Sequence, residues 1–145
     1  MNENDVDRDP DVRYRFHHSL RAPWQARQEL DAVFAEPDDP IANDVRVATS
    51  ELVTNVVMHT DDGGELRVWD PRPGVPLRIE VEDDDRAPAE IPSTPPPFGG
   101  RGLLVVDAIA DRWGVDPTQR GKVVWAEFDR NRRASERTGI GQDSE

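Results

Sequence analysis

The stretch Glu51-Leu-Val-Thr-Asn55-Val-Val-Met-His59-Thr60 forms the second half of a longer helical pattern that spans residues 41–60 and decides the fold. Apolar residues recur there at steps of three and four, which is the spacing of a helix with one buried face. Glu51 and Asn55 are four residues apart, so they project from one side, about 40° apart around the axis. This pair falls at the edge of the apolar stripe, where a carboxylate and an amide can line a cleft. The alternative is a helix with two ordinary boundary polar residues.

Composition limits the possible functions. The chain has 145 residues, enough for one domain with a real core. The absence of cysteine excludes disulfides and thiolate metal sites. A net charge of −12 argues against direct binding to nucleic acid or to anionic membranes, although it also simply favours solubility. No apolar run reaches the ~20 residues of a membrane helix, and the start of the chain is acidic, unlike a signal peptide. We therefore expect a cytoplasmic protein.

The first part of the chain reads as a leader, a strand and two helices. Residues 1–12 are charged and poor in apolar side chains, which predicts a disordered leader. Residues 14–20 alternate between apolar and polar, the period of a half-buried strand. A first helix is expected to begin at Pro23 and to end before Pro37. The long helix over residues 41–60 follows.

The second part of the chain predicts three more strands and a helix. Alternating apolar residues at 66–68 and 77–81 indicate two strands joined by a proline- and glycine-rich turn. A loop with five prolines follows up to Gly100 and is too long for a routine connector. A buried helix from Leu103 is expected to end near Trp113 and Gly114. The last strand is residues 122–128, so the domain spans residues 13–129, and residues 130–145 form a disordered tail.

Three segments each fit one part of a nucleoside triphosphate. The amide oxygen of Asn55, together with phosphate oxygens, suits Mg²⁺. Glu51, one helical turn away, can accept a proton from an attacking hydroxyl or water. Asp83, at the end of a strand, can accept the exocyclic amine of adenine. The glycine-rich entry to a helix at residues 99–102 presents N–H groups to phosphates, and Arg101 can add a charge-assisted contact. Each signal is weak alone, but their order and separation make the combination stronger.

At these residues the chain resembles the histidine-kinase-like ATPase (GHKL or Bergerat) superfamily, in particular its small anti-sigma-factor, serine-protein-kinase branch. Residues 51–59 resemble the N box, residues 81–83 the start of the first glycine box, and residues 99–104 the second glycine box. The resemblance covers residues 14–128. It implies an α+β fold, a two-layer α/β sandwich in which helices pack on one face of a mixed, mostly antiparallel sheet.

The resemblance also implies the roles of individual residues. ATP would lie between the N-box helix, the strand ending at Asp83 and a lid loop, residues 86–98. Asn55 would bind Mg²⁺, Glu51 would be the catalytic base, and Asp83 would hold adenine. The nucleotide-binding residues of the second glycine box would be Gly100, Arg101, Gly102 and Leu103. The implied partners are a sigma factor and an anti-sigma-factor antagonist protein, with a homodimer as the implied assembly.

The first glycine box departs from the pattern of the superfamily, which usually reads Asp-x-Gly-x-Gly. Here residues 83–87 read Asp-Asp-Asp-Arg-Ala. A side chain at Asp85 restricts the approach of the backbone, and its charge repels phosphates if it points inward, although Arg86 can offset this. The proline-rich lid is stiff. We therefore expect ATP to bind more weakly than in a member that carries both glycines.

Two classes of function remain open. The first is a kinase that phosphorylates a serine of the antagonist protein and otherwise sequesters the sigma factor. The second is a switch module that keeps the nucleotide pocket but has lost catalysis, which the altered glycine box favours. A sensor histidine kinase is disfavoured because there is no room for a helix pair that carries a phosphoacceptor histidine. His59 is expected to be a structural histidine packed near the core.

Overall fold

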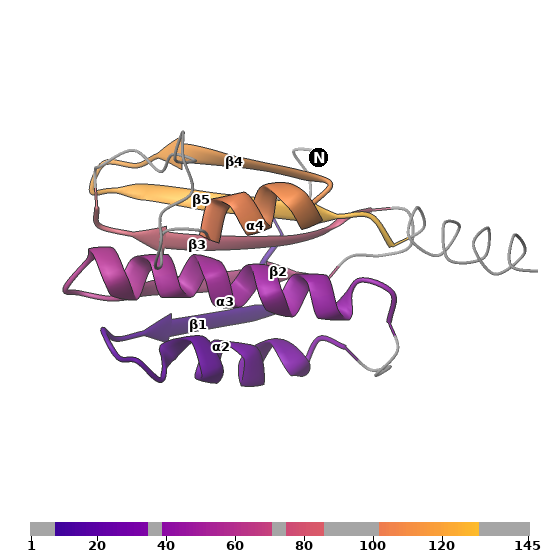
Figure 1. Ribbon diagram of the computed structural model, residues 1–145, viewed down its shortest axis with the longest axis horizontal. Coiled ribbons are helices and arrows are strands. Elements are labelled where there is room, and N and C mark those ends of the chain that lie inside the picture. The colour runs from indigo at the N-terminus through magenta and orange to yellow at the C-terminus, as the bar shows by residue number, and fades with distance from the viewer. Residues whose placement is uncertain (1–7, 35–38, 71–74, 86–101, 131–145) are drawn as a thin grey trace, which may run out of the picture.

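The described part of the chain folds into a sheet covered by helices on one face (Figure 1). The structure is a computed structural model that describes residues 8–34, 39–70, 75–85 and 102–130. Its elements, in chain order, are β1 (Val12–Phe16), α2 (Ala22–Asp31), α3 (Ala42–His59), β2 (Gly64–Trp69), β3 (Leu77–Asp83), α4 (Gly102–Ile109), β4 (Arg112–Pro117) and β5 (Lys122–Phe128).

The five strands form one sheet in the order β1-β2-β3-β5-β4, and every neighbouring pair is antiparallel. Figure 1 shows α2, α3 and α4 side by side on the same face of this sheet. The α+β fold and its two layers are therefore confirmed. Within the described residues the sheet is wholly antiparallel, where the resemblance implied a mixed, mostly antiparallel one.

The core lies between the helices and the sheet. It is built by the apolar residues that recur every three or four positions in the helices and every second position in the strands. Along α3, the buried residues include Val45, Leu52 and Val56, as the helical spacing predicts. In β3, the inward series runs through the buried Ile79 and ends at Asp83. Each fully buried Leu or Ile contributes about 2 kcal/mol of hydrophobic stabilisation relative to exposure. Asp83 is thus carried to the helix-facing side of the sheet by the same alternation that builds the core.

The main error in the predicted elements concerns β4. The sequence predicts a helix that ends near Trp113 and Gly114, but α4 ends at Ile109 and β4 begins at Arg112. The alternation of Trp113 and Val115, which pack against the core, is the period of a strand. Pairing with β5 stabilises this edge strand. The sequence of β4 alone does not reveal that it will pair with β5.

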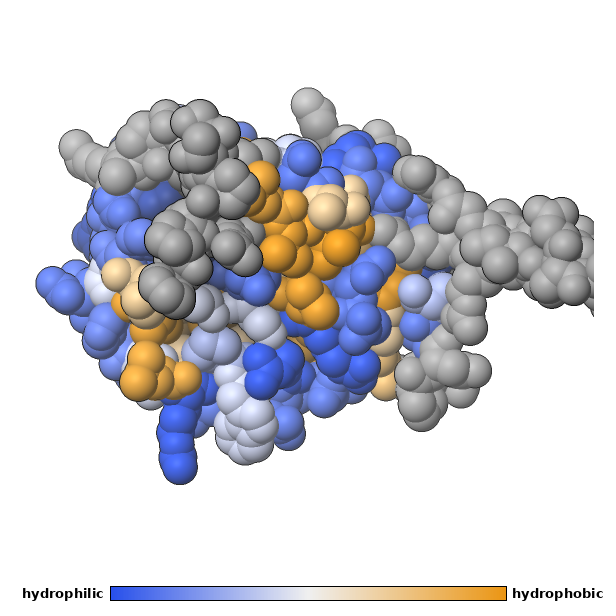
Figure 2. Space-filling view, in the orientation of Figure 1, coloured by the Kyte–Doolittle hydropathy of each residue, from blue (hydrophilic) through white to orange (hydrophobic). Residues whose placement is uncertain are grey.

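Three smaller expectations are also corrected. β1 ends at Phe16, which pairs with the first residue of β2, so the chain beyond it has no strand partner and Leu20 is 88 % exposed. His59 is exposed, as is Met58 before it, while Val56 and Val57 in the same last turn of α3 are buried. α4 buries only one side, through residues such as Leu103 and Val106, and Figure 2 shows apolar surface gathered over it.

Several predicted features lie outside the described residues. They are residues 1–7 of the expected leader, the lid loop at 86–98, the glycines and arginine at 99–101, and residues 131–145 of the expected tail. No helix within the described ranges is long and apolar enough to cross a membrane.

Candidate functional site

The structure brings Asn55 of the N-box helix into contact with Gly102, the first residue of α4. A Cβ atom placed on Gly102 would lie 2.9 Å from both Oδ1 and Nδ2 of Asn55. A side chain there would displace the amide, so glycine is needed for this close approach. The N–H groups in the first turn of α4 have no partner within the helix and carry the positive end of its dipole. Two motifs far apart in the sequence therefore form one site suited to a metal-bound phosphate.

Glu51 lies one turn before Asn55, and both side chains are half-buried. Neither makes a hydrogen bond or an ion pair with any residue that the structure describes. Two other polar side chains of α3 are engaged, since Arg46 pairs with Asp31 and Ser50 accepts a hydrogen bond from Arg27. The carboxylate and the amide predicted from the sequence are thus available for a ligand.

Asp83 ends β3 and is only 5 % exposed. Its Oδ1 atom accepts a hydrogen bond from the backbone N–H of Asp85 at 2.8 Å and one from Nζ of Lys122 at 3.2 Å. Burial raises the pKa of Asp83 above its ordinary value, although the N–H of Asp85 and the charge of Lys122 partly oppose the rise. Among the described residues, both contacts fall on Oδ1. The second oxygen, Oδ2, can therefore accept a donor from a ligand.

Lys122 is a site residue that the sequence reading missed. It begins β5 and is directly opposite Asp83 in the sheet register. Its Nζ atom also lies 3.0 Å from the carbonyl oxygen of Asp85 and 3.7 Å from the Oδ2 atom of that residue. A signal was present in the sequence, because Lys122 is the only lysine in the chain. Its contact with Asp83 could not be predicted from the sequence, because it depends on the register between β3 and β5.

The acidic run that replaces the first glycine box forms a turn of its own. The N–H of Asp85 bonds back to the side chain of Asp83, two residues earlier, which is the arrangement of an Asx turn. Among the described residues, no position other than a glycine has a positive φ, so the conformation at Asp85 does not require glycine. The charge of Asp85 faces Lys122. The sequence analysis gave Arg86 the role of offsetting the charge of Asp85, and Arg86 lies outside the described residues.

The second glycine box is described only from Gly102 onward. Leu103 is 5 % exposed, and its side chain belongs to the core, so only its backbone is available to a nucleotide. Gly100 and Arg101 lie outside the described ranges. Within those ranges, no three His, Asp or Glu side chains are grouped to hold a metal ion. Magnesium held by Asn55 would take its other ligands from phosphate and water.

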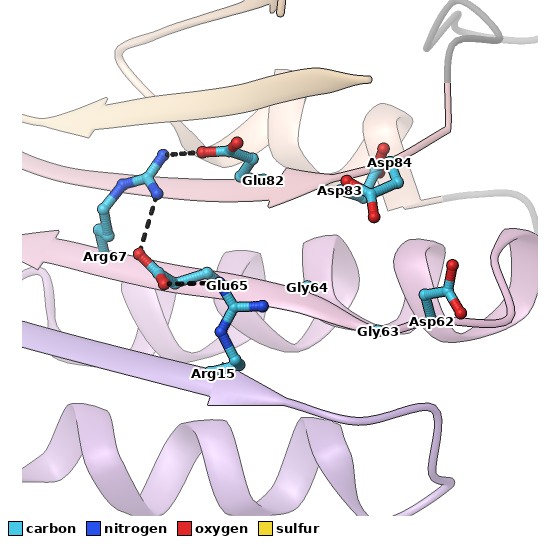
Figure 3. A pocket seen from close by; sticks show the side chains of 9 residues that line it. All are labelled: Arg15, Asp62, Gly63, Gly64, Glu65, Arg67, Glu82, Asp83 and Asp84. Carbon is cyan, nitrogen blue, oxygen red and sulfur yellow. Dashed lines mark hydrogen bonds and ion pairs between the residues drawn. The ribbon is translucent and has the colours of Figure 1, made fainter. Parts of the chain in front are cut away.

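A hollow of about 280 Å³ lies on the opposite face of the sheet, beside the end of β3 (Figure 3). Arg67 lines the hollow and forms ion pairs with Glu65 at 3.0 Å and with Glu82 at 2.9 Å. Burial alone would raise the pKa of Glu65, but its hydrogen bonds and proximity to Arg67 and Arg13 lower it below the ordinary value. These side chains largely satisfy one another, and they form a network of ion pairs over the face of the sheet opposite to α2, α3 and α4 (Figure 3).

Comparison with known families agrees with this geometry. Residues 17–128 match the family described as the histidine kinase-like ATPase domain. No curated protein matches the chain. The matched range includes Glu51, Asn55, Asp83, Gly102, Leu103 and Lys122 of the candidate site. The match confirms the predicted superfamily, while the anti-sigma-factor branch stays a prediction. The chain belongs to the histidine kinase-like ATPase domain family.

Proposed function

We propose that the domain binds ATP and Mg²⁺ between α3, the end of β3 and the start of α4, and that it acts as a regulator of the anti-sigma-factor, serine-protein-kinase type. The observation that carries the proposal is the contact between Asn55 and Gly102. It joins the N box to the second glycine box, which are separate signals in the sequence. Asp83, buried on the same face of the sheet, supports the adenine end of the site.

Each residue has a defined task in this proposal. When bound, ATP with its magnesium ion supplies the phosphoryl group and the metal charge that offsets phosphate. Asn55 offers its amide oxygen to the metal. The first-turn N–H groups of α4, opened by Gly102, face the phosphates. Oδ2 of Asp83 accepts the exocyclic amine of adenine.

Glu51 supplies the chemistry. Its carboxylate would accept the proton of a serine hydroxyl on the antagonist protein as that hydroxyl attacks the γ-phosphorus of ATP, the bond from phosphorus to the bridging oxygen breaks, and ADP leaves. Glu51 lies one turn from Asn55, a place that would hold the base beside a phosphate bound to the same magnesium ion. The resemblance supports a sigma factor as the second partner and a homodimer as the assembly.

The second candidate is a switch module that binds nucleotide without transferring phosphate. The altered first glycine box favours it, because Asp85 and Ala87 stand where the superfamily usually carries glycine. Incubation of the protein with radiolabelled ATP and the cognate antagonist separates the two candidates. Labelled antagonist supports the kinase, and measurable nucleotide binding without label supports the switch.

The first test is calorimetry with ATP and with ADP, each with and without magnesium. We expect binding that is stronger with magnesium for the wild-type protein. Asn55→Ala should lose the magnesium-dependent part, at least about tenfold in affinity, because one metal ligand is removed. Its circular dichroism should remain that of the wild type, since Asn55 is only half-buried. A wild-type protein that ignores both nucleotides at millimolar concentration would contradict the proposal.

A further inference from the structure

Three oxygen atoms converge on the ammonium group of Lys122. Nζ lies 3.2 Å from Oδ1 of Asp83, 3.0 Å from the carbonyl oxygen of Asp85 and 3.7 Å from Oδ2 of Asp85. The side chain of Lys122 is only 12 % exposed. The contact therefore joins the start of β5 to the end of β3 and to the turn that follows β3.

The choice of lysine fits this arrangement. Apart from three histidines, all other basic residues of the chain are arginines, and the single lysine stands at this position. An ammonium group is a compact charge whose three donors can each meet a separate acceptor, whereas a guanidinium is a planar fork suited to one carboxylate. Acceptors that come from a side chain and from the backbone of another residue match the ammonium.

We propose that Lys122 is the positioning residue of the base-recognition site, where it holds Oδ1 of Asp83 and the backbone of Asp85 so that Oδ2 of Asp83 faces the exocyclic amine of the base. The proposal rests on the function proposed above and deepens it. Lys122 does not itself touch the base amine. It acts through Asp83. Its contact with the carbonyl oxygen of Asp85 also holds the turn of residues 83–85, where the superfamily usually carries a glycine.

The charges around Asp83 explain why a cation is needed. Asp83 is buried, and the acidic residues Asp84 and Asp85 follow it directly, while Asp62 and Glu82 line the neighbouring hollow. Lys122 supplies the cation that contacts Asp83 from β5. Without it, desolvation and the charge of Asp85 would favour the protonated form of Asp83, which is a weaker acceptor for an amine.

The test compares Lys122→Met with Arg120→Met, using ATP and inosine triphosphate. Arg120 is exposed in the same hairpin, so its variant removes an equal charge away from Asp83. Inosine triphosphate lacks the exocyclic amine. We expect Lys122→Met to weaken ATP about tenfold at pH 7 and inosine triphosphate much less, because only the amine depends on Asp83. The loss of ATP affinity should grow as the pH is lowered. Arg120→Met should leave both affinities unchanged.

A second measurement needs no nucleotide. With a single lysine in the chain, protein labelled with ¹³Cε-lysine gives one side-chain signal. The carboxylates of Asp83 and Asp85 both face this ammonium group, so we expect the signal to shift in acid and to lose the part of the shift that comes from Asp83 in Asp83→Asn. This measurement uses the wild-type pair and stands even if Lys122→Met fails to fold.

The outcomes separate this proposal from the proposed function. Wild-type protein that binds neither nucleotide overturns the function and this inference with it. Wild-type binding that Lys122→Met leaves unchanged, or equal losses for ATP and inosine triphosphate, overturns the positioning role alone. A lysine signal that does not respond to Asp83 overturns it as well.

Discussion

At the scale of single residues, some side chains of the candidate site already make hydrogen bonds within the protein, and others are available to bind a ligand. Asp83 is fixed through one oxygen, whereas Glu51 and Asn55 make no hydrogen bond or ion pair within the described part of the chain. The charged residues on the outer face of the sheet are paired with one another. Substitutions at these two groups should therefore affect different properties, nucleotide chemistry in the first case and stability in the second.

Glu51→Gln should remove phosphoryl transfer and keep nucleotide binding. The amide has nearly the same shape as the carboxylate but cannot act as a base, so we expect transfer to the antagonist to fall at least about a hundredfold. The affinity for ATP should change by less than about threefold, because Glu51 is not a proposed ligand. Transfer is measured with radiolabelled ATP and affinity by calorimetry. Undiminished transfer would rule out Glu51 as the base.

Glu65→Gln should lower stability in a pH-dependent way. The side chain of Glu65 is 13 % exposed, and its arginine contacts hold its pKa below the ordinary 4.5 despite the opposing effect of burial. A lowered folded pKa gives stability that is present above the unfolded value and is lost as the pH falls through the folded value. We expect the variant to be less stable by about 1–2 kcal/mol at pH 7, with the difference vanishing in strong acid.

Urea unfolding from pH 7 down to pH 3 measures this difference. Asp116→Asn is the matched control, because Asp116 is an exposed acid on the edge strand β4. It should show little change at any pH. A loss in Glu65→Gln that stays constant through the acid range would mean that packing, and not the ion pairs, is responsible.

At the scale of elements, local periodicity predicted most of the fold. The spacing of Leu52 and Val56 predicted α3, and the alternation through Ile79 and Val81 predicted β3. The edge strand β4 was missed because Gly114 resembles a helix stop and the strand is stabilised by β5.

The candidate site was predicted only in part, for a related reason. Glu51, Asn55 and Asp83 were predicted from their residue types and their order in the chain, and their roles stay predictions. Lys122 was not predicted, because a contact between β3 and β5 depends on the register of a pairing between distant segments. Local sequence contains propensity and periodicity, and it does not contain that register.

Gly102→Ala tests the junction between α3 and α4. The added methyl group would meet the amide of Asn55 at 2.9 Å, and the end of that side chain can rotate away at low cost. In a helix interior alanine is favoured over glycine by about 0.8–1 kcal/mol, and only part of this applies to Gly102 as the first residue of α4, so stability should be unchanged or slightly higher. Magnesium-dependent ATP affinity should fall about tenfold, because the amide is displaced from the metal position.

Gly114→Ala provides the contrasting variant. Its added methyl group would lie 2.7 Å from the ring of Trp125, which stacks on Arg78 at 4.4 Å, so the ring must shift. We expect a loss of about 1–2 kcal/mol in the free energy of unfolding and no change in ATP affinity. If the two glycine variants have the same effects, the contact of Gly102 with Asn55 is not specific to the site.

At the scale of the whole molecule, the two ends of the sheet have different tasks. The register pairs Asp83 with both Gly64 and Lys122, so the candidate site lies at one end. At the other end, Arg130 follows β5 and contacts Asp39 at 2.9 Å and Asp70 at 2.7 Å. This arginine joins the entry to α3, the exit of β2 and the end of β5.

Arg130→Ala should weaken the fold without affecting the nucleotide. Two charge-assisted contacts with partly buried carboxylates are lost, and we expect the free energy of unfolding to fall by about 1–2 kcal/mol. ATP affinity should be unchanged, since the site is at the opposite end of the sheet. Urea denaturation and calorimetry measure the two quantities, with Arg120→Ala as the exposed control. A fall in affinity with unchanged stability would contradict this division.

Because Lys122 is the single lysine of the sequence, the domain can be labelled covalently at one side chain. Guanidinium groups do not react with active esters or aldehydes under mild conditions, so apart from the terminal amine such reagents meet one side-chain target, Lys122. An adenosine derivative that carries an acylating group would bring the reagent to that amine beside Asp83. Occupancy could then be counted by mass spectrometry as one added adduct per chain.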